Sequence, residues 1–555
     1  MTDQNKTPVS AEQETLAALG AGGSGTNPIS RHEEGLSSIA HKIFSFPALL
    51  GALLASAVML GARANLPDPD LWWHLMVGRQ ILATHHWPTT DSFSFTVYGN
   101  AWIAFEWLGE VLMAAVERIG GLEALQAMLV GFTGALALLV YYYAYLRSRN
   151  WKASFVACFF TLLLATGFFT LRPQIMGYIC LVGVLICLEK YRQGKAGALW
   201  FLPPIFLVWV NAHGSFVLGA LALAIFLASG LTGFQMGGVV TERWSQNQRI
   251  RIESAGLLSL AALAMTPYGT RLAAYPLQMA LSQPINIANV AEWQSIGFGE
   301  VWGKQVFALM FVFFLAVMIF RPRYRLDEIL LLAFAIFLAF EHRRFFPFMA
   351  IVLAPMVAVL LSRWIPKYAA SSDHYVLNAV LIAALLVGWV RLFPSRRDLD
   401  KAIASLYPQA ALNYITGHPQ PGRLFNEFLW GGYMIWKRGP QHKVFIDGRT
   451  DVYEYAGVFG DYLHIVQLNP QALFLLRKYD IGSALLTPDD PLGTLLNALP
   501  NWQRVYADDV CVLYARKSAA ASPAPAKPGD SAPFSTSTDF HAEGSNFRPA
   551  QAVKW

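Results

Sequence analysis

The chain has 555 residues, of which 55% are hydrophobic and only 14% are charged, whereas an average soluble domain is about 25% charged. Apolar runs of about 17 to 25 residues recur along it, as helices that cross a bilayer require. The composition therefore excludes an ordinary soluble protein. The net charge of +6 is spread over short clusters between the apolar runs, which indicates membrane topology rather than nucleic-acid binding.

The first 42 residues are rich in Gly, Ser, Thr and Glu and show no sustained helical or strand period. This composition predicts a disordered cytoplasmic tail at 1–42. Residues 43–393 predict an α-helical polytopic membrane domain with about eleven transmembrane helices. The expected spans lie at about 43–62, 122–146, 153–171, 173–189, 198–211, 214–232, 254–272, 305–320, 326–340, 345–362 and 376–393.

Basic clusters fall on every second loop between these spans, for example at 147–149 and 321–325. By the positive-inside rule those loops are cytoplasmic, and the alternate loops lie outside. The Arg343–Arg344 pair departs from this rule on an outer loop, which suggests that it holds a ligand. The unusual polar residues of the outer loops are Asp68, Asp70, Arg172, Gln174, Asn211, His213, Tyr268, Glu292, Trp293 and Glu341 to Arg344.

The first outer loop, at 63–121, contains the run Asp68 to His74, which reads Asp-Pro-Asp-Leu-Trp-Trp-His. Pro69 favours a turn, so in one interpretation Asp68 and Asp70 form a solvated helix cap. In a second, one carboxylate is a general base for an acceptor hydroxyl or amine. In a third, either carboxylate helps to bind a divalent cation such as Mg or Mn. The four cysteines show no metal-binding spacing and no disulfide framework.

Three glutamates follow in the same loop. Glu106 and Glu110 are four residues apart and Glu117 lies seven further on, so a helix would place all three on one face. That stripe is either the solvated face of an interfacial helix or, at Glu106, a neighbour of the Asp68 and Asp70 site that shares its charge.

Arg172 and His213 lie at the ends of predicted spans, where ionisable side chains are costly and are functional candidates. An arginine at the interface can also simply snorkel, and a lone histidine is more often structural. The run Asn211 to Ser215 interrupts two apolar stretches with small and polar residues, as backbone that lines a cavity does. Arg172, Arg343 and Arg344 together suit a phosphate or pyrophosphate group.

From about residue 394 the hydropathy drops, and 394–517 predicts a small α/β domain on the outer side. The expected elements are strands at 444–449, 481–486 and 510–514 and a helix at 472–478. Residues 518–555 are rich in Ala, Pro and Ser, which predicts a disordered tail. Neither a Walker loop nor a GxGxxG run follows a predicted strand, so cytosolic nucleotide binding has no support.

The first outer loop continues with Gly78, Pro88, the run Asp91 to Thr96, Gly99, Trp102 and Glu106-Trp107-Leu108. With the run Asp68 to His74, it resembles the first loop of multi-pass glycosyltransferases of the GT-C superfamily, in particular bacterial proteins related to protein mannosyltransferases and aminoarabinose transferases. The resemblance implies catalytic acids in this loop and a polyprenyl-phosphate sugar donor. The family's adjacent Asp-Glu pair is replaced here by Asp68-Pro-Asp70.

On this resemblance we expect inverting transfer of a sugar from the polyprenyl-phosphate donor to an extracytoplasmic acceptor, which is a glycan, a lipid or a protein. Asp70 or Asp68 would be the base, with Glu106 beside them. The leaving phosphate would be stabilised by Arg172, Arg343 and Arg344. Residues expected to line the cleft are Trp73, His74, Asn211, His213, Tyr268 and Glu292.

The resemblance also implies a place in the cell inner membrane. The alternating loop charges and the odd number of predicted spans place the N-terminus in the cytoplasm and the C-terminal domain outside. The runs Trp430 to Tyr433 and Phe445 to Asp451 resemble the soluble tail of uncharacterised members, and a cap over the acceptor cleft is one role for it. The expected partners are the donor lipid, the acceptor and the bilayer, with no nucleic acid.

Two other classes of function stay open. A transporter or flippase for a lipid-linked saccharide would need internal repeats or paired broken helices, and the sequence shows one break, at 211–215. A non-catalytic scaffold for envelope assembly would use the C-terminal domain to bind a partner, and it would tolerate substitution of Asp68 and Asp70.

Overall fold

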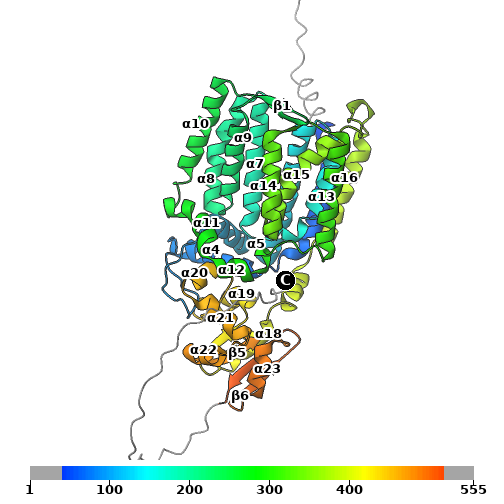
Figure 1. Ribbon diagram of the computed structural model, residues 1–555. Coiled ribbons are helices and arrows are strands. Elements are labelled where there is room, and N and C mark those ends of the chain that lie inside the picture. Colours follow the sequence, from blue (N-terminus) through cyan, green and yellow to red (C-terminus); the bar gives the residue numbers. More distant parts are fainter. Residues whose placement is uncertain (1–40, 518–555) are drawn as a thin grey trace, which may run out of the picture.

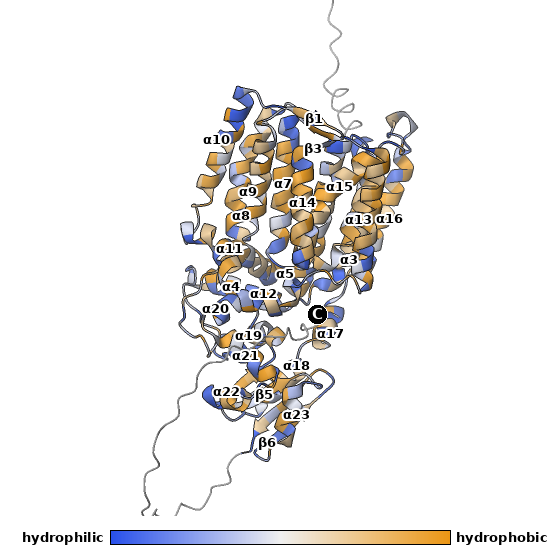
Figure 2. Ribbon diagram, viewed as in Figure 1, coloured by the Kyte–Doolittle hydropathy of each residue, from blue (hydrophilic) through white to orange (hydrophobic). Residues whose placement is uncertain are grey.

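The computed structural model describes residues 41–517, and Figure 1 shows a bundle of long helices with a smaller region of short helices and strands at one end. The tails predicted at 1–42 and 518–555 lie outside the described residues, apart from His41 and Lys42. Figure 2 shows that the bundle helices are mostly hydrophobic and that polar residues gather at their two ends. This distribution is typical of a helical protein that spans a membrane.

Each of the predicted spans overlaps a helix of the bundle. These helices are α3 (Phe46–Ala62), α5 (Trp107–Ser148), α6 (Trp151–Leu163), α7 (Gln174–Arg192), α8 (Leu202–Ala212), α9 (Phe216–Ser229), α10 (Gln246–Ala262), α13 (Val301–Phe320), α14 (Leu326–Glu341), α15 (Phe346–Leu361) and α16 (Tyr375–Leu392). Within residues 41–517, six segments are long and apolar enough to cross a membrane. They are Phe46–Asn65, Trp107–Ser148, Gln174–Arg192, Val301–Phe320, Arg343–Leu361 and Tyr375–Leu392.

The span predicted at 254–272 is displaced, because α10 begins at Gln246 and ends at Ala262. A capping box starts this helix: the Gln248 N–H donates to Ser245 Oγ, and the Ser245 N–H donates to Gln248 Oε1. Hydropathy does not detect this start, since the first turns of α10 carry Gln and Arg. The predicted span also included part of α11 (Thr270–Ser282), a separate helix.

The first outer loop is held against the end of the bundle by α4 (Pro69–Thr84). This helix packs on the first part of α5, which is kinked at Gly120 and Gly121, where the backbone is not helical. Gly78 of α4 lies so close to α5 that an added Cβ would be 2.1 Å from the carbonyl oxygen of Glu110. The two helices therefore approach each other backbone to backbone, which requires glycine at this position.

The C-terminal region surrounds a sheet with the strand order β4-β5-β7-β6. β4 and β5 are parallel, and the other pairs are antiparallel. The elements are α17 (Arg396–Ala404), α18 (Gln409–Gly417), β4 (Arg423–Asn426), α19 (Gly431–Arg438), α20 (Thr450–Tyr455), α21 (Val458–Val466), α22 (Ala472–Lys478), β5 (Ile481–Leu486), α23 (Pro491–Ala498), β6 (Trp502–Ala507) and β7 (Val512–Arg516). The predictions for α22 and β5 are confirmed, and β7 begins two residues later than predicted.

The strand predicted at 444–449 is wrong. This segment is buried, but it pairs with the first outer loop instead of with the sheet. The Val444 N–H donates to the Phe93 carbonyl at 3.1 Å, and the Phe95 N–H donates to the Val444 carbonyl at 3.0 Å. Ser94 and Val444 thus form an isolated parallel bridge. A buried connection has the same apolar composition as a buried strand, so the pattern did not distinguish them.

Buried hydrophobic side chains form one core within the bundle and a second core below it. The second core combines residues between Leu66 and Leu129 with residues between Leu399 and Tyr514. The first outer loop and the C-terminal region therefore share one hydrophobic core, and the position of the loop depends on the C-terminal region.

The opposite end of the bundle carries a small sheet of β1 (Phe234–Met236), β2 (Val239–Thr241) and β3 (Tyr324–Arg325). Arginines in the last turns of α5 and α7 are paired with acids. Arg192 lies 2.9 Å from Asp327, and Arg147 pairs with Glu328. α4 (Pro69–Thr84) and α12 (Pro284–Asn289) lie at the other end, beside the C-terminal region (Figure 1).

Replacement of Gly78 by alanine is expected to lower the stability of the purified protein by about 1–3 kcal/mol, because the new Cβ overlaps the backbone of α5. Gly131→Ala is the matched control, since Gly131 lies within α5 and an added Cβ meets no atom within 4 Å. Thermal unfolding in detergent measures both variants. Equal midpoints for Gly78→Ala and wild type would contradict the close approach of α4 and α5.

Candidate active site

The site begins at the N-terminus of α4. Asp68 is the N-cap of this helix, and its Oδ1 accepts the Asp70 N–H at 2.9 Å. Pro69 occupies the first helical position, which suits its fixed φ and missing N–H. The helix-cap interpretation of Asp68 is therefore confirmed, but the side chain is buried and not solvated. The cap places Asp70 in the first turn, one residue after the proline.

Arg172, just before α7, lies between three carboxylates. Its Nε donates to Asp68 Oδ1 at 2.7 Å, and its Nη1 lies 2.8 Å from Asp70 Oδ2. The same Nη1 is 3.3 Å from Glu292 Oε2. On the other side of Glu292, Arg344 Nη1 lies 3.2 Å from Oε1, and its guanidinium stacks 4.1 Å from the Trp293 ring centroid. We refer to Asp68, Asp70, Arg172, Glu292 and Arg344 as the charge cluster.

Two acids of the charge cluster have opposite pKa shifts. Burial raises the pKa of Asp70 to about 6, against the lowering effect of Arg172, and Asp68 raises it further. Burial also acts to raise the pKa of Glu292, but Arg344 and Arg172 together lower it below its ordinary value. Asp70 is therefore the more basic of the two carboxylates, while Glu292 stays ionised between its arginines.

A second polar layer lies beside the charge cluster and is built on Glu106. Its Oε2 is 3.4 Å from His74 Nε2 and its Oε1 is 3.2 Å from His213 Nε2. Burial raises the pKa of Glu106 to about 8 and lowers the pKa of His213 to about 3. Burial likewise lowers the pKa of His74 well below its usual range. At neutral pH the layer therefore consists of a protonated carboxyl between two neutral imidazoles.

The predicted glutamate stripe is thus buried at its first two positions and not solvated. Glu110 Oε1 lies 3.1 Å from His74 Nδ1, which continues the Glu106 layer into α5. Glu117 lies further along and pairs with Arg79 at 2.5 Å, and it also accepts from Trp436 Nε1 at 2.8 Å. Of these three glutamates, only Glu106 and Glu110 reach the site.

The remaining residues predicted to line the cleft divide into two groups. Trp73 joins the charge cluster, because its Nε1 donates to Asp70 Oδ1 at 3.1 Å. Asn211 and Tyr268 instead support the surrounding loops. Asn211 Oδ1 accepts from Trp107 Nε1 at 2.8 Å, and the Tyr268 hydroxyl donates to the Pro88 carbonyl at 2.8 Å.

Arg343, the third predicted phosphate ligand, contributes a backbone hydrogen bond and a positive charge to the site. Its N–H donates to the Gln294 carbonyl at 2.9 Å, which ties the loop after Glu292 to the start of α15. Its positive charge also helps to lower the pKa of Glu292.

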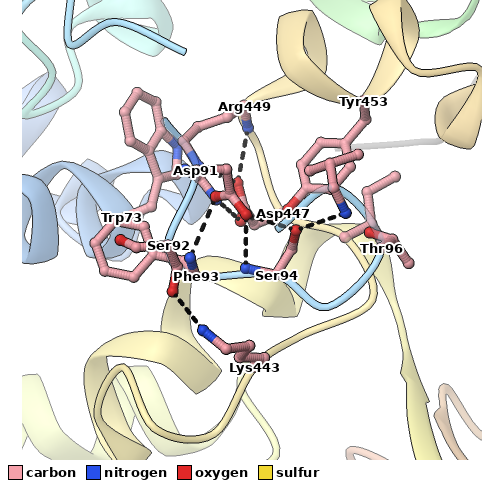
Figure 3. Close-up of polar contacts among 12 residues, drawn as sticks. Trp73, Asp91, Ser92, Phe93, Ser94, Thr96, Lys443, Asp447, Arg449 and Tyr453 are labelled. Atoms are coloured by element: carbon pink, nitrogen blue, oxygen red, sulfur yellow. Dashed lines mark hydrogen bonds and ion pairs between the residues drawn. The ribbon is translucent and has the colours of Figure 1, made fainter. Parts of the chain in front are cut away.

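One part of the site was not foreseen from the sequence. An added Cβ on Gly448, in the C-terminal region, would lie 2.0 Å from Asp70 Oδ1, so the Gly448 backbone rests on the Asp70 carboxylate. The next residue, Arg449, is buried and lies 2.7 Å from Asp91 and 2.7 Å from Asp447 (Figure 3). The signal was present as the run Asp-Gly-Arg-Thr-Asp, but its partners are more than 300 residues away in the sequence.

A divalent cation was one alternative for the acidic loop. Among residues 41–517, no group of three or more His, Cys, Asp and Glu side chains is arranged to hold a metal ion. The carboxylates of Asp68, Asp70 and Glu292 point instead to the Arg172 guanidinium. The arrangement of these residues therefore does not fit a carboxylate cage for Mg or Mn.

Comparison with protein-family models and with curated protein sequences finds no match for this chain. Solved structures do show similarity. The oligosaccharyltransferase of Archaeoglobus fulgidus in its apo form aligns with 79% of this chain and 69% of its own, at 13% identity and a TM-score of 0.48. The same organism's oligosaccharyltransferase AglB, in complex with an inhibitory peptide and a dolichol-phosphate, aligns with 78% and 68%, at 12% identity and a TM-score of 0.48.

ArnT from Cupriavidus metallidurans, bound to undecaprenyl phosphate, aligns with 86% of this chain and 99% of its own, at 14% identity and a TM-score of 0.42. The structural similarity to these GT-C glycosyltransferases thus extends over most of the chain, at low sequence identity.

Glu106→Gln is expected to match the stability of the wild type below about pH 4.5, where the carboxyl is protonated in both the folded and the unfolded chain. At neutral pH the variant should be more stable than the wild type, because the unfolded wild-type carboxyl ionises there and the amide stays neutral. Glu106→Ala leaves the buried His74 and the partly buried His213 without this partner and should cost about 1–3 kcal/mol. The folded pKa of about 8 exceeds the unfolded value, so this group's stabilising effect is complete below about pH 4.5 and is lost as the pH rises to about 8.

Thermal unfolding between about pH 5 and pH 9, the range in which this group ionises, measures both effects. The midpoint of the wild type should fall with rising pH more steeply than that of Glu106→Gln. Parallel pH curves for the two proteins would contradict a protonated Glu106.

Proposed function

We propose that this protein is a multi-pass membrane glycosyltransferase that moves a sugar from a polyprenyl-phosphate donor to an acceptor outside the cytoplasm, with inversion at the sugar. The observation that carries the proposal is the charge cluster, in which a carboxylate with a raised pKa lies 2.8 Å from an arginine. A base and an anion-binding group are thus adjacent at one end of the helix bundle, as this reaction requires.

Asp70 is the base in this proposal. With a pKa of about 6 it is mostly ionised at neutral pH and still more basic than an ordinary aspartate. Glu106, with a pKa of about 8, is protonated under the same conditions and cannot accept a proton. Asp68 Oδ1 already accepts from the Asp70 N–H and from Arg172 Nε. Asp68 therefore orients the first turn of α4 and the guanidinium.

The arginines act on the leaving group. Arg172 and Arg344 flank Glu292 at 3.3 and 3.2 Å, so both guanidiniums lie beside the same carboxylate. Arg343 precedes Arg344 in the chain. Guanidinium groups bind phosphate oxygens with charge-assisted hydrogen bonds. Such groups stabilise the negative charge that develops on a departing phosphate.

In the proposed reaction the acceptor oxygen replaces the phosphate on the anomeric carbon of the sugar. The acceptor hydroxyl gives its proton to Asp70, and its oxygen forms a bond with the anomeric carbon of the sugar. The bond between that carbon and the phosphate oxygen breaks, and the electron pair stays on the phosphate. The anomeric configuration inverts, and the polyprenyl phosphate leaves with its charge opposed by the arginines.

The charges of the loops and the position of the site support a proposed membrane topology. We propose that the helices of 43–393 form about eleven spans in the cell inner membrane and that the N-terminus is cytoplasmic. The C-terminal region, 394–517, then lies outside, on the side of the donor lipid's sugar. α4 and α12 lie at the end of the bundle that packs on the C-terminal region, whereas β1 lies at the far end (Figure 1). Asp68 and Asp70 lie at the start of α4, and Glu292 follows α12.

Complementation of a deletion strain tests the proposal. Asp70→Asn removes the base and should reduce one surface glycan or glycoprotein product by about 100-fold or more, while the variant reaches the membrane in normal amounts. Asp489→Asn is the matched control, because this acid is exposed in the C-terminal region. Glycan and glycoprotein profiling, with quantification of the protein in membranes, measures the result.

The profile of Asp68→Asn is expected to fall between these two, since this change leaves the base but loosens Arg172 and the helix cap. A full product profile in cells that carry Asp70→Asn would show that the transferase proposal is wrong in this form.

A further inference from the structure

The run Asp447 to Glu454 joins the C-terminal region to the site at three places. It begins after the buried segment that pairs with the first outer loop and it includes most of α20. Its side chains and backbone contact the first turn of α4, the loop around Asp91 and the segment that leads to Glu292. We call it the joining segment. Each contact is polar or sterically tight, and they involve different parts of the chain.

The first contact is steric. The Gly448 backbone leaves no room for a side chain, because an added Cβ would lie 2.0 Å from Asp70 Oδ1 and 2.9 Å from Trp73 Nε1. Gly432 encloses the same turn from another position, where a Cβ would be 3.0 Å from the Pro69 carbonyl oxygen. Glycine at 448 thus lets the main chain rest on the carboxylate and limits where Asp70 can move.

The second contact fixes Gly448 itself. Arg449 forms buried ion pairs with Asp91 and Asp447, both at 2.7 Å, and the Tyr453 hydroxyl donates to Asp447 at 2.7 Å (Figure 3). The guanidinium also lies 4.9 Å from the centroid of the Trp102 ring. A buried charge is very costly without its partners. The backbone next to Arg449 is therefore held in one position relative to the first outer loop.

The third contact reaches the other half of the charge cluster. Asp451 accepts from the Tyr275 hydroxyl of α11 at 2.6 Å. The carboxylate of Glu454 accepts the N–H groups of Ile285 and Asn286 at 2.8 Å each, in the first turn of α12 (Pro284–Asn289). α12 leads within three residues to Glu292. The joining segment thus holds both the loop of the base and the loop of the arginine partner.

We infer that the joining segment sets the distance between the base and the leaving-group arginines, with Gly448 as the positioning residue for Asp70. This inference rests on the transferase proposal for its chemical meaning, although the contacts themselves do not. It gives the C-terminal region a role in the reaction. A methyl group at 448 should push the Asp70 carboxylate away from Trp73 and Arg172, which hold it in the wild type.

Gly448→Ala is compared with Gly460→Ala, a matched change in the same region where the added Cβ lies 3.9 Å from its neighbour, Ile285. In the deletion strain, Gly448→Ala should lower the amount of the same product that Asp70→Asn lowers. The expected reduction is about tenfold to 100-fold, as displacement of a reacting group by about 1 Å causes. Gly460→Ala should form product at the wild-type level. Membrane amounts of both proteins are measured in parallel.

The pH profile separates positioning from general damage. Arg172 lowers the pKa of Asp70, so a carboxylate displaced from Arg172 needs a higher pH to ionise. Transfer is measured against pH in membranes of the complemented strain, which contain their own donor and acceptor. The acidic limb of the Gly448→Ala rate profile should move to higher pH. A loss of folded protein would lower the whole profile without moving that limb.

Hydrogen–deuterium exchange of the purified proteins tests the contacts without any assay of transfer. Gly448→Ala should accelerate exchange in the peptide 66–77, and Glu454→Gln should accelerate exchange in the peptide 283–293. Gly460→Ala should leave both peptides as in the wild type. Unchanged exchange in 66–77 and an unmoved pH limb in Gly448→Ala would overturn the inference. If Asp70→Asn keeps its product, the transferase proposal fails, and the exchange data alone then decide whether the segment positions the two loops.

Discussion

The guanidinium of Arg172, shared by three carboxylates at the boundary of the helix bundle, is the interaction on which the rest of the site depends. Its side chain is only 12% exposed, and a charge buried to that degree persists only with close partners. Burial opposes its ionisation, but Asp68, Asp70 and Glu292 together hold the pKa of Arg172 well above its ordinary value. The cap of α4, the start of α7 and the Glu292 loop must therefore meet at one point.

The C-terminal region is part of this arrangement and not an appendage. It shares a hydrophobic core with the first outer loop, its Gly448 backbone rests on Asp70, and its Arg449 is neutralised by an acid of the loop. The same region holds α12 through Glu454. The two halves of the charge cluster are thus connected twice, once directly through Arg172 and once through the joining segment.

The helices of the bundle could be predicted because hydropathy measures the apolar character that a helix needs in order to cross a membrane. Where it failed, at α10, a capping box of polar residues set the boundary. The alternating charges of the loops also predicted which polar residues would lie at one end of the bundle. Of these, Asp68, Asp70, Arg172, Glu292 and Arg344 form one connected set of ion pairs. The roles of Asp91, Gly448 and Arg449 could not be predicted, because their contacts join positions far apart in sequence. The buried run at 444–449 looked like a strand since burial alone sets its composition.

The most direct measurement is native mass spectrometry of the purified full-length protein with undecaprenyl phosphate and, separately, with undecaprenol, which has the same chain and no phosphate. The wild type is expected to retain the phosphate lipid in preference to the alcohol, and Arg172→Lys and Arg344→Gln are expected to lose this preference. Arg504→Gln, at an exposed position of β6, should keep it. Equal retention of the two lipids by the wild type, or an unchanged preference in both arginine variants, would contradict a phosphate site at the charge cluster.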